Sequence, residues 1–365
     1  MASLYELDRT SVPVIQPQIF PLKEDIYHIF AVPEYNAIGT NDLDNAITLL
    51  RFQKDKIQYD LRAKNFLKQV SGGGLRFLPV FSKNTIGYAQ TRRFVLFNIK
   101  KNTHKRYTIS KDMSDYPEKV AIIDAKKKHF LIEITHYKSD YDDSCDRILQ
   151  LIDFGSEKEK VLSSVKLGER DLWTVLDKTI FVYFRNNLRA MNINFEPIEH
   201  PFVSLFNNKK ETFGFLTQLK MHPSLPFAVF VELKGKRYKS TLCMASWAKN
   251  TSDKDQPFIT KLVTCKAYNL EYSPDGKWLI FKDSTHKPAK YYLMSVDPEL
   301  PYFLGEPMLL GEVDQRFSSA WISNPLSFVV SELDKLIKWD ITSLYGRMLL
   351  KKFQKQEQKI QKNAE

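Results

Sequence analysis

The sequence predicts an all-β fold made of about seven similar sheets with four strands each. Three observations support it: a weak repeat of about 48 residues, strand–turn–strand patterns inside the repeats, and a composition that favours strands. Aromatic residues make up 13% of the 365 residues, and they suit half-buried pleated surfaces. Repeats of roughly 40 to 50 residues with four short strands are typical of a β-propeller.

One apolar residue in the second strand of each expected repeat marks the spacing. Successive markers lie 44 to 51 residues apart, and they are Ile38, Ile86, Phe130, Ile180, Ala228, Leu279 and Phe328. One isolated sheet cannot bury both of its faces, whereas a closed ring of sheets can. We therefore expect a single propeller domain over residues 1–343, with seven blades centred near these markers. Six or eight blades also fit the pattern.

The sixth repeat shows the pattern most clearly. An apolar strand at 268–272 leads into Ser273–Lys277, with the sequence Ser-Pro-Asp-Gly-Lys, and then into an apolar strand that begins at Trp278. Proline presets φ in such a turn, aspartate tolerates turn conformations, and Gly276 supplies positive φ. Two apolar strands around this turn predict a hairpin.

Two motifs are similar to those of known propellers. Ser273–Lys277 followed by an apolar strand resembles the TolB-type propeller repeat, and Trp339-Asp340 at the end of a strand is similar to the WD-repeat signature. These motifs cover two of the seven repeats. The resemblance implies a propeller fold, TolB-type or WD-repeat-like, and a binding role.

The N-terminal segment is extended in character, because Pro13, Pro17 and Pro21 exclude a helix. Propellers often complete one blade with strands from both ends of the chain. We expect residues 14–15 or 18–20 to pair with the last blade as its outer strand and so to close the ring. Proline is tolerated there, because an outer strand is an edge strand.

The C-terminal residues 344–365 differ from the repeats. They lack proline, and Leu349, Phe353 and Ile360 share one helical face. From Arg347 onward there are six basic and two acidic residues. The sequence therefore predicts a short basic helix or tail, which either binds a partner or packs on the propeller and frays at its end.

The expected location is cytoplasmic. The three cysteines, Cys145, Cys243 and Cys265, are far apart and form no C-x-x-C pair, which argues against a disulfide framework and a zinc site. The first residues carry acids where a signal peptide has a basic start and an apolar run. No run of about 18 apolar residues occurs, so no membrane partner is expected.

No catalytic motif is present, and we expect no catalytic, cofactor-binding or metal-binding residues. The glycines at 72–74 are followed by no Gly-Lys-Ser/Thr, no histidine pair has H-E-x-x-H spacing, and no G-x-S-x-G occurs. Asp140–Asp146 faintly resembles a calcium loop, but Cys145 and Leu151 stand where glycine and glutamate are needed. We interpret it as an acidic loop exposed to solvent.

The net charge of +11 admits anionic partners, and three basic segments are the candidate contact sites. Two are expected in exposed loops between strands, and the third lies in the C-terminal tail. Their residues are Lys100, Lys101, Lys105 and Arg106, then Lys236, Arg237 and Tyr238, then Lys351, Lys352 and Lys355.

The preferred hypothesis is a non-enzymatic scaffold or adaptor subunit of a cytoplasmic complex, which binds a protein, with some preference for acidic ones, through loops on the propeller faces. One alternative is a nucleic-acid-associated subunit, in which the basic loops contact phosphates and Tyr238 stacks on a base. The second alternative is a lactonase-like propeller enzyme, with ligands from several blades at the channel mouth.

Overall fold

In the computed structural model, much of the chain forms β-strands. The described residues are 4–8, 10–22, 26–32, 37–42, 47–53, 56–60, 75–77, 85–90, 93–98, 101, 103–109, 115–139, 142–155, 159–169, 171–184, 187–208, 215–234, 239–247, 257–285, 287–297, 304–314, 318–332, 334–342 and 344. They contain 28 strands and one helix. The strands form seven four-stranded sheets, in which neighbouring strands are antiparallel.

The chain divides into two compact units. The first contains Met1–Pro13 and Asn65–Asp314, and the second contains Val14–Lys64 and Gln315–Glu365. Five of the seven sheets lie in the first unit and two in the second.

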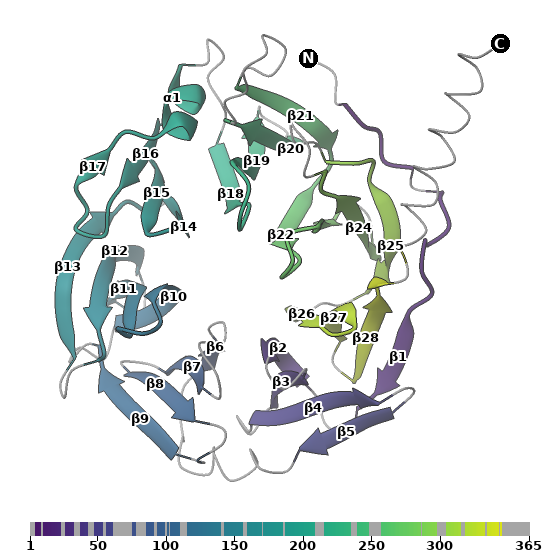
Figure 1. The fold of residues 1–365 in the computed structure, drawn as a ribbon, viewed down its shortest axis with the longest axis horizontal. Helices are drawn as coiled ribbons and strands as arrows, with labels where there is room; N and C mark the ends of the chain where they lie inside the picture. The colour runs from purple at the N-terminus through teal and green to yellow at the C-terminus, as the bar shows by residue number, and fades with distance from the viewer. Residues whose placement is uncertain are drawn as a thin grey trace. The chain divides into compact units, whose positions relative to one another are not determined.

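In the first unit, strands follow one another in chain order within each sheet, and the sheets follow one another in the same way (Figure 1). The sheets consist of β6 (Leu75–Phe77), β7 (Thr85–Gln90), β8 (Arg93–Asn98) and β9 (Thr103–Thr108); β10 (Asp115–Asp124), β11 (His129–Ser139), β12 (Asp142–Asp153) and β13 (Lys160–Leu167); β14 (Leu172–Leu176), β15 (Thr179–Phe184), β16 (Asn187–Met191) and β17 (Pro197–Ile198); β18 (Phe215–Met221), β19 (Phe227–Lys234), β20 (Lys239–Ser246) and β21 (Phe258–Thr264); and β22 (Ala267–Tyr272), β23 (Trp278–Asp283), β24 (Ala289–Ser295) and β25 (Met308–Val313). The helix α1 (Pro201–Asn207) connects the third and fourth of these sheets.

The second unit holds two sheets. One consists of β2 (Ile26–Val32), β3 (Ala37–Asp42), β4 (Ile47–Gln53) and β5 (Lys56–Asp60), and the other of β26 (Ser318–Ser323), β27 (Leu326–Glu332), β28 (Lys335–Asp340) and β1 (Gln18–Pro21). Strand β1 pairs antiparallel with β28, with Ile19 opposite Ile337. The expected pairing of residues 18–20 is thus present within this unit. Closure of a ring by this strand stays a prediction.

All seven spacing markers lie in the second strand of their sheets, from Ile38 in β3 to Phe328 in β27. The side chains of Phe130, Ile180 and Leu279 are fully buried. The second and third strands of each sheet are both flanked by other strands, and the apolar runs of the second strands revealed the repeat spacing.

Two expected loops are strands instead. Residues 103–106 of the first basic segment belong to β9, whose exposed side chains at Thr103, His104, Lys105 and Arg106 hide the alternation of an ordinary strand. Residues 142–146 of the acidic segment belong to β12, where Cys145 lies opposite Tyr137 and Asp146 opposite His136. Exposed outer strands and strand ends accept polar residues, which caused both wrong predictions.

The hairpin turn of the sixth repeat is confirmed. Gly276 has a φ of +70°, and its N–H donates to the carbonyl of Ser273 at 2.9 Å. The Ser273 hydroxyl donates to Asp275 at 2.6 Å and accepts from the N–H of Trp278 at 3.0 Å. Side chains therefore fix the turn between β22 and β23.

His222 ties this turn to the neighbouring sheet. Its Nε2 donates to the carbonyl of Gly276 at 2.8 Å, and its Nδ1 accepts from the N–H groups of Ser224 and Leu225 at 3.1 and 2.9 Å. This pattern requires a neutral ring with hydrogen on Nε2. Burial lowers the pKa of His222 below its ordinary value, against the smaller raising effect of the bond to Gly276.

We predict that Gly276→Val lowers the free energy of unfolding by roughly 2 to 4 kcal/mol, from positive φ and overpacking together. A Cβ atom at this position would lie 2.9 Å from Cε1 of His222. Gly276→Asn should cost less, because asparagine tolerates positive φ while meeting the same ring. Urea denaturation of both variants measures the difference, and unchanged stability of the valine variant would contradict this account of the turn.

Candidate functional site

Helix α1 is the main departure from a pure strand pattern, and it forms one wall of the candidate site. His200 caps its N-terminus, because its Nδ1 accepts from the N–H of Phe202 at 3.1 Å. Pro201 occupies the first helical position, where its missing N–H costs nothing. The helix spans only seven residues and ends at Asn207.

The helix completes the outer edge of the sheet β14–β17. Strand β17 pairs with β16 only through Ala190–Ile198 and Met191–Pro197. Further along β16, the side-chain amide of Asn207 accepts from the N–H of Leu188 at 3.0 Å and donates to its carbonyl at 2.9 Å. One side chain thus copies the hydrogen bonds of a missing strand residue.

Aromatic side chains fix α1 against two sheets. Phe202 and Phe206 are buried. Phe202 stacks on Trp247, with ring centres 4.9 Å apart, and Phe206 contacts Tyr183 and Phe230 at 5.9 and 5.6 Å. Tyr183 belongs to β15 and Phe230 to β19, so the helix is a rigid wedge between neighbouring sheets of the first unit.

An open groove of about 890 Å³ lies between α1 and β21. Apolar side chains line much of it and polar groups sit at intervals, as is usual for binding sites. The lining residues are Glu199, His200, Pro201, Ser204, Leu205, Asn208, Pro257, Phe258 and Ile259. Burial lowers the pKa of His200 below its ordinary value, which keeps its capping Nδ1 free to accept at neutral pH.

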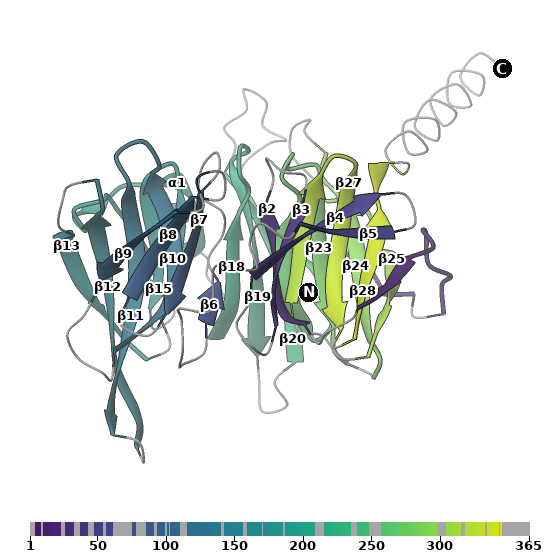
Figure 2. The same ribbon diagram turned by 90° about the horizontal axis from the view of Figure 1, so that it is seen from below.

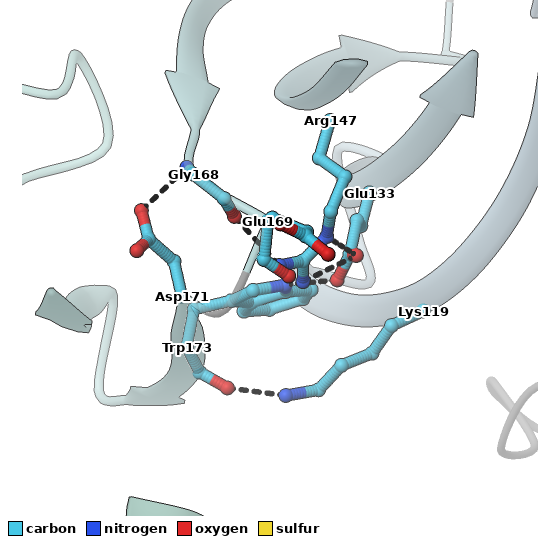
Figure 3. Close-up of polar contacts among 7 residues, drawn as sticks. All are labelled: Lys119, Glu133, Arg147, Gly168, Glu169, Asp171 and Trp173. Carbon is cyan, nitrogen blue, oxygen red and sulfur yellow. Dashed lines mark hydrogen bonds and ion pairs between the residues drawn. The ribbon is translucent and has the colours of Figure 1, made fainter. Parts of the chain in front are cut away.

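A second polar constellation joins β11, β12 and β14 (Figure 3). The carboxylate of Glu133 accepts from Nε of Arg147 at 2.8 Å and from the indole nitrogen of Trp173 at 2.6 Å. Nη2 of Arg147 lies 2.7 Å from the same carboxylate. The side chains of Glu133 and Arg147 are only 6% and 14% exposed, so each buried charge is stabilised by the opposite charge of its partner.

Arg147 also holds the loop that precedes β14. Its Nη1 donates to the carbonyls of Gly168 and Glu169, both at 2.8 Å. Within the same loop, the Asp171 carboxylate accepts from the N–H of Gly168 at 2.7 Å. The charges of Glu133, Arg147 and Asp171 therefore serve inter-sheet packing and loop shape, and each of the three has a hydrogen-bond partner (Figure 3).

Lys119 lies beside this cluster, on β10. Its ammonium group donates to the main-chain carbonyl of Trp173 and lies 4.1 Å from the centre of the indole ring. Although part of the side chain is exposed, loss of water around the ammonium group lowers the pKa of Lys119 to about 8. The positive charge of Lys220 lowers it further, and Glu133 raises it.

The structure places three of the predicted partner-binding residues. Lys101 is exposed, and its N–H donates to the side chain of Asn98 at 2.8 Å. Lys105 and Arg106 are exposed neighbours on β9. Consecutive strand residues point to opposite faces, so the two do not form one patch. Lys105 lies 5.0 Å from the ring centre of Tyr107.

The other predicted partner-binding residues lie outside the described part of the chain. They are Lys100, Lys236, Arg237, Tyr238, Lys351, Lys352 and Lys355. The expected C-terminal helix lies outside it as well.

Sequence reasoning did not find the groove or the charge cluster. Signals for both were present. Glu133 sits in the apolar run Phe130–Ile134, and Arg147 precedes the apolar run Ile148–Ile152; charges at such positions need partners. His200-Pro201, followed by phenylalanines four residues apart, is a short helix start.

Within the described residues, no group of three or more His, Cys, Asp or Glu side chains is placed to hold a metal ion. In the same part of the chain, no helix combines the length and apolar character that a membrane crossing requires.

Comparison with solved structures identifies the fold. The β-propeller domain of Cps50 (Swd1) from Myceliophteria thermophila aligns with 90% of this chain and 100% of its own length, with a TM-score of 0.54 and 9% identity. The WD40 domain of SCAP from fission yeast aligns with 89% of this chain and 98% of its own, with a TM-score of 0.44 and 10% identity. No protein-family model and no curated protein sequence matches.

The chain therefore has a WD-repeat-like β-propeller fold, as the repeat spacing and the Trp339-Asp340 motif predicted. The TolB-type assignment stays a prediction. At 9% identity the similarity is one of fold, and function must be argued from the site.

We predict that Arg147→Met lowers the free energy of unfolding by about 3 to 5 kcal/mol, because it leaves the buried carboxylate of Glu133 without its cation. The double variant Glu133→Leu with Arg147→Met should be more stable than Arg147→Met alone, since no charge then stays buried. Denaturant titration of the variants measures this. A double variant less stable than the single one would contradict the account.

We predict that Lys119 titrates with a midpoint near pH 8, more than two units below the value of about 10.4 for an ordinary lysine. Loss of its charge should change Trp173 emission over this range, and the change should disappear in Lys119→Met and in Trp173→Phe. Lys220→Met should raise the midpoint, because it removes a neighbouring positive charge. An unshifted midpoint in Lys220→Met would show that the two lysines do not interact.

Proposed function

We propose that this chain is a non-enzymatic scaffold that binds a protein partner through the groove between α1 and β21. The observation that carries the proposal is the groove itself. It combines about 890 Å³ of open volume with walls fixed by Phe202, Phe206 and Asn207. A rigid, largely apolar groove with spaced polar groups suits recognition of a polypeptide.

The fold supports this proposal without deciding it. Propeller sheets form a stiff framework on which loops carry recognition. In the Glu133 cluster, the charges of Glu133, Arg147 and Asp171 are engaged in packing between sheets and in loop contacts, which supports a structural role for them. We propose the cytoplasm as the location and residues 1–343 as the propeller domain, followed by a basic tail.

Exposed cations on β9 and just before it favour an additional preference for anionic surfaces. Lys101, Lys105 and Arg106 are all exposed, and the chain carries a net charge of +11. This feature supports an acidic protein partner, and it is also the observation that favours the second candidate, a nucleic-acid-associated role. Phosphate contacts would give an affinity that falls steeply with salt concentration.

We predict that Ser204→Arg abolishes capture of the partner, because Ser204 is an exposed residue of α1 that lines the groove and arginine would place a bulky cation in the groove. Affinity purification of the tagged full chain from its native cell, followed by mass spectrometry, measures the recovery. Ser204→Ala is the matched control and should retain the partner.

Recovery of the same partners by both variants would contradict the groove as the binding site. Recovery of no partner by the unaltered chain would contradict the scaffold role. Partners that disappear after nuclease treatment would support the nucleic-acid-associated role instead.

A further inference from the structure

A short segment near the N-terminus already lies on the outer edge of β21. The N–H groups of Leu4 and Tyr5 donate to the carbonyls of Lys261 and Leu262 at 3.0 and 2.9 Å. Tyr5 and Val263 form a parallel bridge. The edge of this sheet therefore accepts an extended segment through an isolated parallel bridge.

Tyr5 anchors the segment. Its hydroxyl donates to the carbonyl of Leu304 at 2.8 Å, next to the adjacent sheet β22–β25. Tyr5 and Leu7 pack against the core of the first unit, whereas Leu4, Glu6 and Asp8 are exposed. This alternation of inward and outward side chains is typical of a strand.

The direction of pairing leads to the groove. In a parallel pair, positions that precede Tyr5 on an added strand run toward lower numbers on β21, and so from Val263 toward Ile259 and Phe258. These two residues line the groove beside α1. One extended peptide can therefore contact the β21 edge and the groove at the same time.

We propose that the β21 edge is a strand-addition site for an extended partner peptide with a Leu-Tyr-x-Leu pattern, and that the chain's own segment 4–8 competes for this site. The chain's own residues supply the chemistry of the occupant: main-chain pairing, an aromatic hydroxyl aimed at the carbonyl of Leu304, and a leucine two positions later. This inference rests on the proposed role as a protein-binding scaffold.

Competition follows from the covalent link. A segment attached to the site has a high effective concentration there, so a free peptide must displace it. Weakening the attached segment should tighten binding of the free peptide. A peptide added to the β21 edge gains affinity from main-chain hydrogen bonds and specificity from its alternate side chains, as in other strand additions.

The test uses the full chain and a fluorescent peptide with the sequence of residues 2–10, Ala-Ser-Leu-Tyr-Glu-Leu-Asp-Arg-Thr. Fluorescence anisotropy gives its affinity. The Tyr5→Ala chain should bind the peptide at least tenfold more tightly than the unaltered chain does, because its own segment is weakened. Val12→Ala is the control; this residue follows segment 4–8, its side chain is 75% exposed, and its change should leave the affinity unchanged.

Peptide variants test the anchor. Replacing the tyrosine of the peptide by phenylalanine should weaken binding to the Tyr5→Ala chain roughly fivefold, the value of one net hydrogen bond, and alanine should abolish it. Equal affinity of the unaltered and Tyr5→Ala chains would overturn the competition, and so would absence of binding to a folded Tyr5→Ala chain. If the peptide fails to bind while partner capture remains sensitive to Ser204→Arg, the strand-addition site is wrong and the scaffold role stands.

Discussion

Every strand at the edge of a sheet presents main-chain N–H and carbonyl groups that need partners, and this requirement shapes the candidate site. In the first unit it is met in two unusual ways. The amide of Asn207 replaces a strand residue beside Leu188, and the segment around Tyr5 adds to β21. Both sets of hydrogen bonds lie in the sheets next to α1. The groove exists because a helix, rather than a full outer strand, completes the sheet β14–β17.

Charge burial within the same unit follows a related logic. Glu133 and Arg147 sit in strands whose neighbours are apolar, and each would be costly alone. Their mutual pairing, together with Trp173 and the loop carbonyls of Gly168 and Glu169, satisfies both groups. The pairing also fixes the position of a loop. The loop before β14 is held by side chains of the preceding sheet, so neighbouring sheets keep a defined register.

The sequence predicted the parts of the fold that depend on local periodicity. The seven second strands and the positive φ of Gly276 follow from short-range patterns, and both are confirmed. Contacts between distant residues were not predictable in this way. The bond between Tyr5 and Leu304 joins positions 299 residues apart, and no spacing rule connects them. The bond between the indole of Trp173 and Glu133 likewise joins residues that are 40 positions apart.

The wrong predictions have a common physical origin. Residues 103–106 of β9 were predicted to lie in a loop because the basic segment that contains them lies between two apolar strands. An outer strand is open to solvent, so its side chains are not forced to alternate between apolar and polar. Residues 142–146 lie where β11 and β12 project beyond the other strands of their sheet (Figure 2), and β13 pairs with β12 only from Arg147 onward. Charge in a strand-rich repeat therefore does not by itself distinguish a loop from a strand.

A bound segment at an edge has consequences for how the site can respond. Two main-chain hydrogen bonds, one side-chain hydroxyl bond and the packing of Tyr5 against the core hold residues 4–5 among the described contacts. Each such bond contributes about 1 kcal/mol net in water. A contact of this size permits exchange with a competing strand, whereas the buried aromatic wedge of α1 is fixed. The site thus combines the rigid wall formed by α1 with the segment around Tyr5, which a partner can replace. The partner then makes the main-chain bonds that this segment makes now, and no sheet has to unfold.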